Sequence, residues 1–304
     1  MILASSNINL KTQLYSLRQL LYILSIIAIA CLFYKFLESQ ALKHSAALFI
    51  GIPVFMSISL ASISNIKHIP LTVTAGLSAG LLASFLYLKE GSFCVPMTAP
   101  LFLITGLIIS YSFVKLRQSN FTKLYYLLPV FLLSLLSLEG IHNSTSIARV
   151  QTVSSTIDVN LSALEIKQAL SQNRQISDIP LLLSYGFPQP KTVEGSGLNV
   201  GDKRSIYFSG GEGLPGTAVF EITKLKSNSI EYSLIDDSSH ISHWLNWKKS
   251  TVSWQEITPG YTRVSWSIDY ERKLDPFWYF GPIEKLAVSL AARTLLNNFI
   301  SSEN

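Results

Sequence analysis

Long stretches without a formal charge occupy most of the first 140 residues. Ser45–Ile66 runs for 22 residues, Ile69–Leu88 for 20 and Gly91–Val114 for 24. A helix of ~20 apolar residues crosses the hydrocarbon core of a bilayer. Shorter apolar stretches lie before and after these three, at Gln19–Tyr34 and Leu124–Leu138. Residues 1–140 are therefore predicted to form an α-helical transmembrane bundle of about five spans, near 19–37, 45–66, 69–88, 96–114 and 123–139.

Two other interpretations of these stretches have less support. Helices buried in a soluble core normally carry a polar stripe, which is missing here. A cleaved signal peptide would account for the first stretch, because Ser39-Gln40-Ala41 resembles a cleavage site. However, Lys35 and Glu38 lie between this site and the apolar residues, where a signal peptide is normally neutral. We therefore expect the first stretch to be a retained helix.

The distribution of Lys and Arg predicts the orientation of the bundle. With five spans, the side that holds the N-terminus carries six of these residues and the opposite side carries four. Because cytoplasmic loops are enriched in Lys and Arg, we expect a cytoplasmic N-terminus and an extracytoplasmic C-terminal domain. The lack of cysteine after residue 139 is compatible with a bacterial inner-membrane protein whose domain is periplasmic. The orientation of the domain reverses if one of the short stretches does not span.

Charge patterning argues against several classes of function. Residues 1–139 carry a net charge of +6 and residues 140–304 of −1, which together give the total of +5. The basic excess thus lies between apolar stretches and not on the polar domain, which argues against nucleic-acid binding. The predicted spans hold no ionisable residue at mid-depth, which disfavours a pump or channel. Gly76 and Gly80 have the G-x-x-x-G spacing, which favours close helix packing, within the bundle or in a dimer.

The remaining residues change to a pattern typical of an α+β domain. Residues 141–150 are a predicted linker and residues 151–304 the predicted domain. An extended segment at 153–160 leads into a helix, where Ser162 is the predicted N-cap and Glu165 follows three residues later.

Strands with a period of two follow this helix. The clearest has alternating apolar side chains that predict an antiparallel sheet with one covered face; these are Val264, Trp266, Ile268 and Tyr270. The chain closes with a long apolar helix. Pro282 is predicted at its first position, with Glu284 in its first turn and Leu286 and Leu290 on the apolar face.

This order of elements resembles the START-like, or SRPBCC, helix-grip superfamily. The stretch Thr262–Trp266, followed by Tyr270–Leu274 and Asp275–Pro282, is similar to the last strand and closing helix of polyketide cyclase/dehydrase-like members. The resemblance covers residues 150–304. It implies a curved antiparallel sheet around the long C-terminal helix, with a hydrophobic cavity between them. It does not imply one function, because a fold hosts many functions.

Aromatic and apolar residues expected on the inner face are the candidate ligand-binding residues. Tyrosine and tryptophan combine a large apolar surface with a polar group that can orient a ligand. The candidates are Tyr232, Trp254, Trp266, Ile268, Tyr270 and Leu290. Ordinary core packing explains any one of them equally well. We expect no catalytic residue, no metal ion and no cofactor.

Three groups of polar residues are candidate sites of chemistry. Asp236, Asp237, His240 and His243 are metal-ligand types, but a turn between strands is a usual place for solvated polar residues. Tyr232, Tyr270 and Glu256 are the ionisable residues at plausible inward positions. Trp244 and Trp247, with Lys248 and Lys249, suggest either a contact with lipid headgroups or an exposed strand edge. No nucleophile, phosphate-loop or zinc-protease motif is present.

Three functions remain open from the sequence. The favoured one is a membrane-anchored extracytoplasmic domain that binds a lipid or another hydrophobic ligand without catalysis. The second is a structural or regulatory subunit of a membrane complex, in which side chains fill the cavity. The third is a cyclase-like enzyme on an apolar substrate, which requires polar groups that converge inside the cavity. The expected partners are membrane lipids and a small hydrophobic ligand, without nucleic acid.

Overall fold

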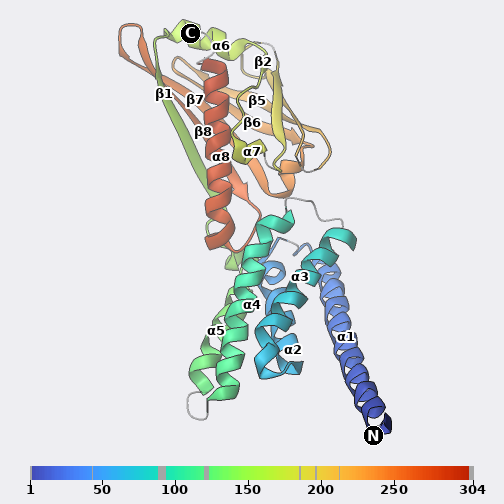
Figure 1. The fold of residues 1–304 in the computed structure, drawn as a ribbon. Coiled ribbons are helices and arrows are strands. Elements are labelled where there is room, and N and C mark those ends of the chain that lie inside the picture. Colours follow the sequence, from blue (N-terminus) through green and yellow to red (C-terminus); the bar gives the residue numbers. More distant parts are fainter. Residues whose placement is uncertain are drawn as a thin grey trace. The chain divides into compact units, whose positions relative to one another are not determined.

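The structure is a computed structural model that describes residues 2–42, 44–87, 94–119, 123–184, 186–195, 197–211 and 213–300. The chain divides into two compact units, Met1–Ser146 and Ile147–Asn304 (Figure 1). The first unit is helical, and the second contains the sheet. Each unit has its own cluster of buried apolar side chains.

The first unit contains five apolar helices, in agreement with the five predicted apolar stretches. They are α1 (Ile2–Ser39), α2 (Ile52–Ile63, preceded by the π-helical turn η1, Ala47–Gly51), α3 (Ile69–Tyr87, preceded by the 3-10 turn η2, Ile66–His68), α4 (Cys94–Gln118) and α5 (Lys123–Leu136). In the described part of the chain, three segments are long and apolar enough to cross a membrane: Leu20–Ser39, Ile66–Leu86 and Cys94–Gln118. Two segments are shorter, Ala47–Ile63 and Leu124–Leu136, so a total of five spans stays a prediction.

The two glycines of the G-x-x-x-G motif face α2 within the same chain. A Cβ atom added to Gly76 would lie 2.4 Å from Cδ1 of Leu60, and one added to Gly80 would lie 2.9 Å from Cε of Met56. The missing side chains let α3 approach α2 closely. This motif therefore serves packing within the bundle.

Arg117 of α4 closes the C-terminal end of α2. Its guanidinium donates hydrogen bonds to the backbone carbonyls of Ser64 at 2.5 Å, Ala61 at 2.9 Å and Ser62 at 2.9 Å. The last carbonyls of a helix have no partner within the helix, so a cation there satisfies them and complements the helix dipole.

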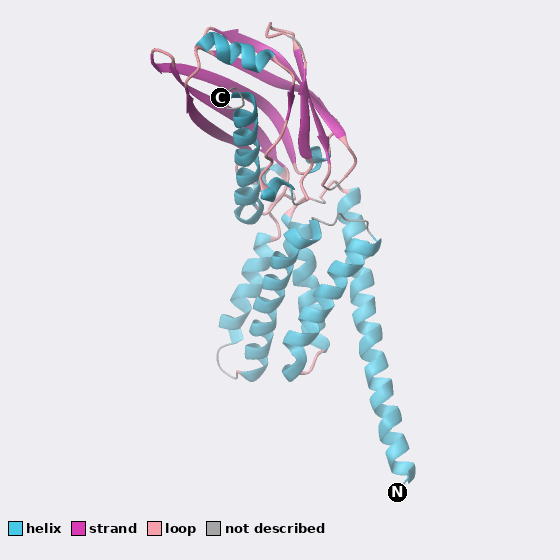
Figure 2. Cartoon of the chain, turned by 45° about the horizontal axis from the view of Figure 1, so that its top comes forward, coloured by secondary structure: helices cyan, strands magenta, loops and turns pink. Residues whose placement is uncertain are grey.

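The second unit contains one antiparallel sheet of eight strands. Their order is β1-β8-β7-β6-β5-β4-β3-β2, so β1 pairs with β8 and the later strands follow one another. The strands are β1 (Val150–Val159), β2 (Arg174–Gln175), β3 (Gln189–Glu194), β4 (Lys203–Ser209), β5 (Gly216–Lys226), β6 (Ser229–Asp237), β7 (Leu245–Thr258) and β8 (Tyr261–Arg272). Figure 2 shows that the sheet is strongly curved. The predicted curved antiparallel sheet is confirmed.

The helices of this unit are α6 (Ala163–Ser171), the short α7 (Leu181–Ser184) and the long α8 (Phe277–Ile300). The predicted capping box starts α6: the Glu165 amide donates to Ser162 Oγ at 3.4 Å, and the Ser162 amide donates to Glu165 Oε2 at 2.7 Å. The sheet curves around α8, which packs against β1 and β8 (Figures 1 and 2). This is the helix-grip arrangement.

The start and the buried face of α8 differ from the prediction. The helix begins at Phe277, so Pro282 lies inside it and not at its first position. Proline has no N–H to donate to the carbonyl of Trp278, four residues earlier, so α8 lacks one backbone hydrogen bond at this point. The buried face is also rotated: Glu284 is buried, whereas Leu286 is 52% exposed. Packing against the sheet therefore decides which face is covered, not the count of apolar residues.

The two tryptophans at the start of β7 are also placed differently from the prediction. Both are buried: Trp247 lies opposite Tyr270 on the inner face of the sheet, and Trp244 lies just before β7. Trp244 contacts the ring of Phe187, and Trp247 belongs to the main apolar cluster. Only the neighbouring Lys248 remains exposed.

Candidate functional site

Five of the six candidate ligand-binding residues come together on the inner face of the sheet. Tyr232, Trp254, Trp266, Ile268 and Tyr270 all belong to one buried cluster, to which β1, β3, β4, β5, β6, β7, β8, α6 and α8 contribute. Leu290 is half-buried and lies outside the buried set of that cluster. The alternation of apolar and polar side chains along β8 therefore predicted correctly which of them face inward.

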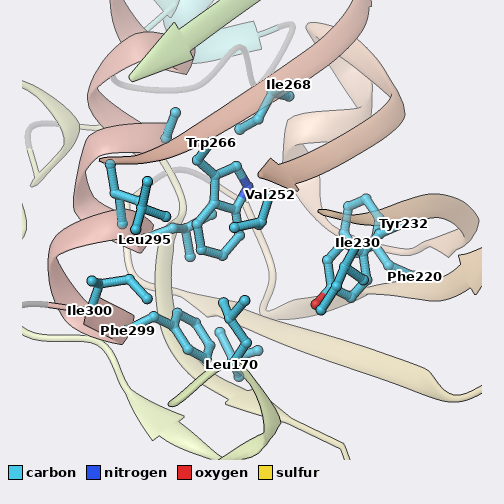
Figure 3. Close-up of a cluster of buried hydrophobic side chains, with 14 of the residues drawn as sticks. Leu170, Phe220, Ile230, Tyr232, Val252, Trp266, Ile268, Leu295, Phe299 and Ile300 are labelled. Atoms are coloured by element: carbon cyan, nitrogen blue, oxygen red, sulfur yellow. The ribbon is translucent and has the colours of Figure 1, made fainter. Parts of the chain in front are cut away.

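Trp266 lies at the contact between the sheet and α8. Its Nε1 donates a hydrogen bond to Ser250 Oγ at 2.7 Å, and its ring centroid lies 5.7 Å from that of Phe299. In Figure 3, Leu295 and Phe299 of α8 lie on the same side of the Trp266 ring, and Leu170 of α6 lies next to Phe299. Tyr232 gathers with Phe220 and Ile230 over another part of the sheet (Figure 3).

Several polar atoms on this inner face are buried without a hydrogen-bond partner among the described residues. They include the indole nitrogens of Trp247 and Trp254, the hydroxyl oxygen of Tyr270 and both carboxylate oxygens of Glu284. More than 90% of buried polar groups in proteins have a partner, and one without a partner costs about 1–3 kcal/mol. Such groups in an apolar interior need an explanation in terms of water, a ligand or function.

A buried charge cluster lies next to the start of α8. Arg272 Nη1 donates to Asp275 Oδ1 at 2.6 Å and to the Leu274 carbonyl at 2.5 Å. Its Nη2 donates to the Ile147 carbonyl, and its guanidinium lies 4.9 Å from the ring centroid of Phe277. Arg149 Nη2 binds the second oxygen of Asp275 at 3.1 Å. One carboxylate therefore serves two arginines in a site where Arg272 and Asp275 are fully buried.

Glu284 is the second acid of this cluster, and it is 7% exposed. Burial raises the pKa of Glu284 to about 8, and the carboxylate of Asp275 adds to this rise. The positive charges of Arg272 and Arg149 and the nearby Leu274 amide act in the opposite direction, but they do not outweigh burial. No hydrogen bond of good geometry to either oxygen comes from the described residues. Glu284 is therefore largely protonated and uncharged at pH 7.

Tyr270 lies between this cluster and the aromatic interior. Burial and the charge of Glu284 raise the pKa of Tyr270 to about 12, so its hydroxyl keeps its proton. Tyr270 lies directly opposite Trp247 in the register of β8 and β7, and paired residues of antiparallel strands face the same side of a sheet. Trp247, Tyr270 and Glu284 thus bring three polar groups to one end of the inner face.

The other polar candidates from the sequence do not reach the interior. Glu256 is exposed near the end of β7, where its Oε1 accepts a hydrogen bond from the Gly260 amide at 3.0 Å. His240 and His243 lie in the 3-10 turn η4 (His240–His243), with their rings stacked at 4.4 Å. Asp237 Oδ1 accepts from the Ser239 amide at 2.8 Å. Within the described ranges, no three His, Cys, Asp or Glu side chains come together in a way that could hold a metal ion.

Sequence reasoning missed the four charged members of the polar cluster, Arg149, Arg272, Asp275 and Glu284, although a signal for one of them was available. The alternation of β8 extends by one step beyond Tyr270 and places Arg272 on the buried face. Asp275 follows three residues later, within reach of its side chain. Glu284 gave no such signal, because an acid in the first turn of a helix is usually exposed.

Comparisons with known proteins concern the fold alone. No protein-family model matches the sequence, and no curated protein sequence matches it significantly. Among solved structures, a START superfamily protein from Mycobacterium smegmatis matches with 16% identity and a TM-score of 0.35, over 50% of this chain and 99% of that protein. A major latex-like protein from Panax ginseng matches with 14% identity and a TM-score of 0.30, over 50% and 98% of the two chains. Norcoclaurine synthase from Thalictrum flavum matches with 16% identity and a TM-score of 0.31, over 48% and 87%.

The architecture itself settles the fold of the second unit. The unit opens with a strand and a helix and continues with a series of antiparallel strands, of which the last pairs with the first. It closes with a long helix that the curved sheet surrounds. The second unit of this chain therefore has a START-like, or SRPBCC, helix-grip fold.

Proposed function

We propose that this chain is an integral membrane protein whose helix-grip domain binds a lipid or another hydrophobic ligand. The observation that supports it best is the set of buried polar atoms without partners on an otherwise apolar inner face. A ligand with an apolar body and a small polar group would bury its body against the aromatic side chains and supply partners to these atoms.

The membrane part of the proposal rests on the apolar helices of the first unit. Three of them are long and apolar enough to span, and the two shorter ones complete the five-span arrangement that we propose. Lys and Arg counts favour a cytoplasmic N-terminus and an extracytoplasmic helix-grip domain, as in a bacterial inner-membrane protein. A domain tethered at a bilayer meets its apolar ligands at high local concentration.

The experiment is native mass spectrometry of the full chain, extracted from the membranes in which it is expressed. We expect a fraction of the protein to retain an apolar molecule after the detergent is removed in the instrument. A protein that shows only its own mass, and that takes up nothing from an added total lipid extract, would contradict binding and favour the structural-subunit interpretation.

A pair of variants locates the bound molecule. Ala292→Leu adds volume at a fully buried position of α8, and overpacking of this kind costs about 1–3 kcal/mol. We expect it to reduce the retained mass. Ala291→Leu makes the same change at the half-exposed neighbouring position and should leave it unchanged. All five tryptophans lie in the helix-grip domain, so their fluorescence shows whether each variant is folded. Equal retention in both folded variants would place the molecule outside the helix-grip interior.

A further inference from the structure

Three groups with buried polar atoms that make no hydrogen bond of good geometry with the described residues lie together at the end of the inner face where α8 begins. Tyr270 is fully buried, Glu284 is 7% exposed and Trp247 is 9% exposed. Tyr270 faces Trp247 across the β7–β8 pair and interacts electrostatically with Glu284 of α8. They come from two neighbouring strands and from the helix that the sheet surrounds, so they converge on one region between sheet and helix.

All three groups can donate a hydrogen bond. An indole N–H only donates, and a phenol O–H donates readily. A protonated carboxylic acid also has one proton to donate. Nothing among the described residues accepts from these three groups. Tyrosine and a protonated carboxylic acid can also accept, but an acceptor is the kind of partner that suits all three groups.

We propose that Trp247, Tyr270 and Glu284 bind the carbonyl oxygen of an apolar ligand that lies between α8 and the sheet. This inference rests on the function proposed above and specifies the polar group of the ligand. A carbonyl oxygen has no proton to donate and two lone pairs, so it can accept two of these hydrogen bonds at full strength, and the third donor shares a lone pair with one of them. The apolar cluster around Trp266 would contact the hydrocarbon part of the same ligand.

The surrounding charges are compatible with an uncharged acceptor. Arg272 of β8 and Arg149, which precedes β1, both bind Asp275 in the connection between β8 and α8. These three residues and Tyr270 are the charged or titratable groups that act on Glu284. The two arginines are thus directed towards Asp275 and backbone carbonyls, and the three donors are left for the ligand.

The test compares two probes that differ by a single oxygen, 2-heptadecanone and heptadecane. The full chain in detergent is equilibrated with each probe and passed through gel filtration, and the retained probe is measured by mass spectrometry against empty micelles. One hydrogen bond contributes about three- to tenfold in affinity. With several donors, we expect the ketone to be retained at least tenfold more than the hydrocarbon.

Substitutions at the donors should remove this preference. Tyr270→Phe and Trp247→Phe each remove one donor and should each lower ketone retention about three- to tenfold. Tyr207→Phe is the matched control, because it removes a hydroxyl from an exposed residue of β4. Tyr270→Phe should also leave the thermal stability of the ligand-free protein unchanged or higher, because it deletes a buried group without a partner. A purely structural role for Tyr270 predicts the opposite change in stability.

The pH dependence separates Glu284 from the other two donors. Above pH 8 the carboxyl loses its proton and repels an acceptor oxygen, so ketone retention should fall between pH 7 and pH 9. Glu284→Gln keeps an N–H donor and has no proton to lose, so it should bind the ketone equally at both pH values. A decrease of the same size in Glu284→Gln would overturn the role of Glu284.

The outcomes also separate this inference from the proposed function. Equal retention of the ketone and the hydrocarbon would overturn the carbonyl site and leave apolar binding intact. Retention of neither probe, together with a bare mass after exposure to lipid extract, would overturn both proposals.

Discussion

Arg272 and Asp275 form an ion pair in which Nη1 and Oδ1 lie 2.6 Å apart and both side chains are fully excluded from solvent. Removal of one partner of a buried pair leaves the other charge uncompensated, which costs about 3–5 kcal/mol of stability. We therefore expect Asp275→Asn to lower the free energy of unfolding of the helix-grip domain by about 4 kcal/mol. Urea unfolding of the full chain, followed by tryptophan fluorescence, measures this change.

The matched control for this prediction is the exposed pair of Arg263 and Asp158. Its atoms are equally close, at 2.7 Å, but the arginine side chain is 54% exposed. Arg263 Nη2 also donates to Asp158 Oδ2 at 2.8 Å, but solvent screens the pair, so Asp158→Asn should cost at most about 1 kcal/mol. Similar losses in the two variants would show that burial does not set the strength of the Arg272–Asp275 pair.

The raised pKa of Glu284 predicts that the helix-grip domain is more stable in mild acid. An unfolded glutamate titrates near ~4.3, whereas the folded carboxyl titrates at about 8. Between these two pKa values the folded state binds one proton more than the unfolded state. The stabilisation that Glu284 provides is therefore fully present below the unfolded pKa and is lost as the pH rises to about 8. The slope from one such group is at most about 1.4 kcal/mol per pH unit.

Glu284→Gln isolates this contribution from other titrating groups. The wild-type free energy of unfolding minus that of Glu284→Gln should decrease from pH 5 to pH 8 and then level off. Urea unfolding at each pH provides the two values. A difference that stays constant over this range would mean that Glu284 is ionised in the folded protein.

Arg204 joins the C-terminal end of α6 to the loop that follows β3. Its guanidinium donates to the carbonyls of Leu170 and Gly195 at 2.8 Å, of Gly197 at 3.1 Å and of Gln172 at 3.3 Å. Arg204→Met should destabilise the domain by about 3 kcal/mol, because it leaves several buried carbonyls without a donor. Thermal unfolding checks this, with Lys203→Met at the exposed neighbouring position as a control that should change little.

Gly76 tests the packing of the helical unit. A β-branched side chain there would collide with Leu60, which is fully buried. Gly76→Ile should therefore lower the temperature at which the detergent-solubilised chain leaves its gel-filtration peak by several degrees. Overpacking of this kind costs about 1–3 kcal/mol. Ala75→Ile places the same side chain on the exposed face of α3, and an equal loss there would rule out the contact with α2 as the cause.

The sequence alone determined the features that depend on near neighbours along the chain. The capping box of Ser162 and Glu165 is complete within four residues, and the alternation from Val264 to Tyr270 follows from the geometry of one strand. The sequence also predicts the apolar helices of the first unit, because a stretch without charges can be recognised without tertiary information. The overall order of strand, helix, strands and long helix was sufficient to identify the helix-grip fold.

Only the tertiary structure decided which polar residues of this fold belong to its interior. The sequence predicts Glu284 as an exposed acid in the first turn of a helix that starts at Pro282. In the structure the helix starts at Phe277, so Glu284 is its eighth residue, and it is buried because the sheet curves over that face of α8. Arg149 and Asp275 are more than 120 residues apart and meet because β1 pairs with β8. Strand pairing and sheet curvature bring together residues that are distant in sequence, and a periodic pattern carries no information about such contacts.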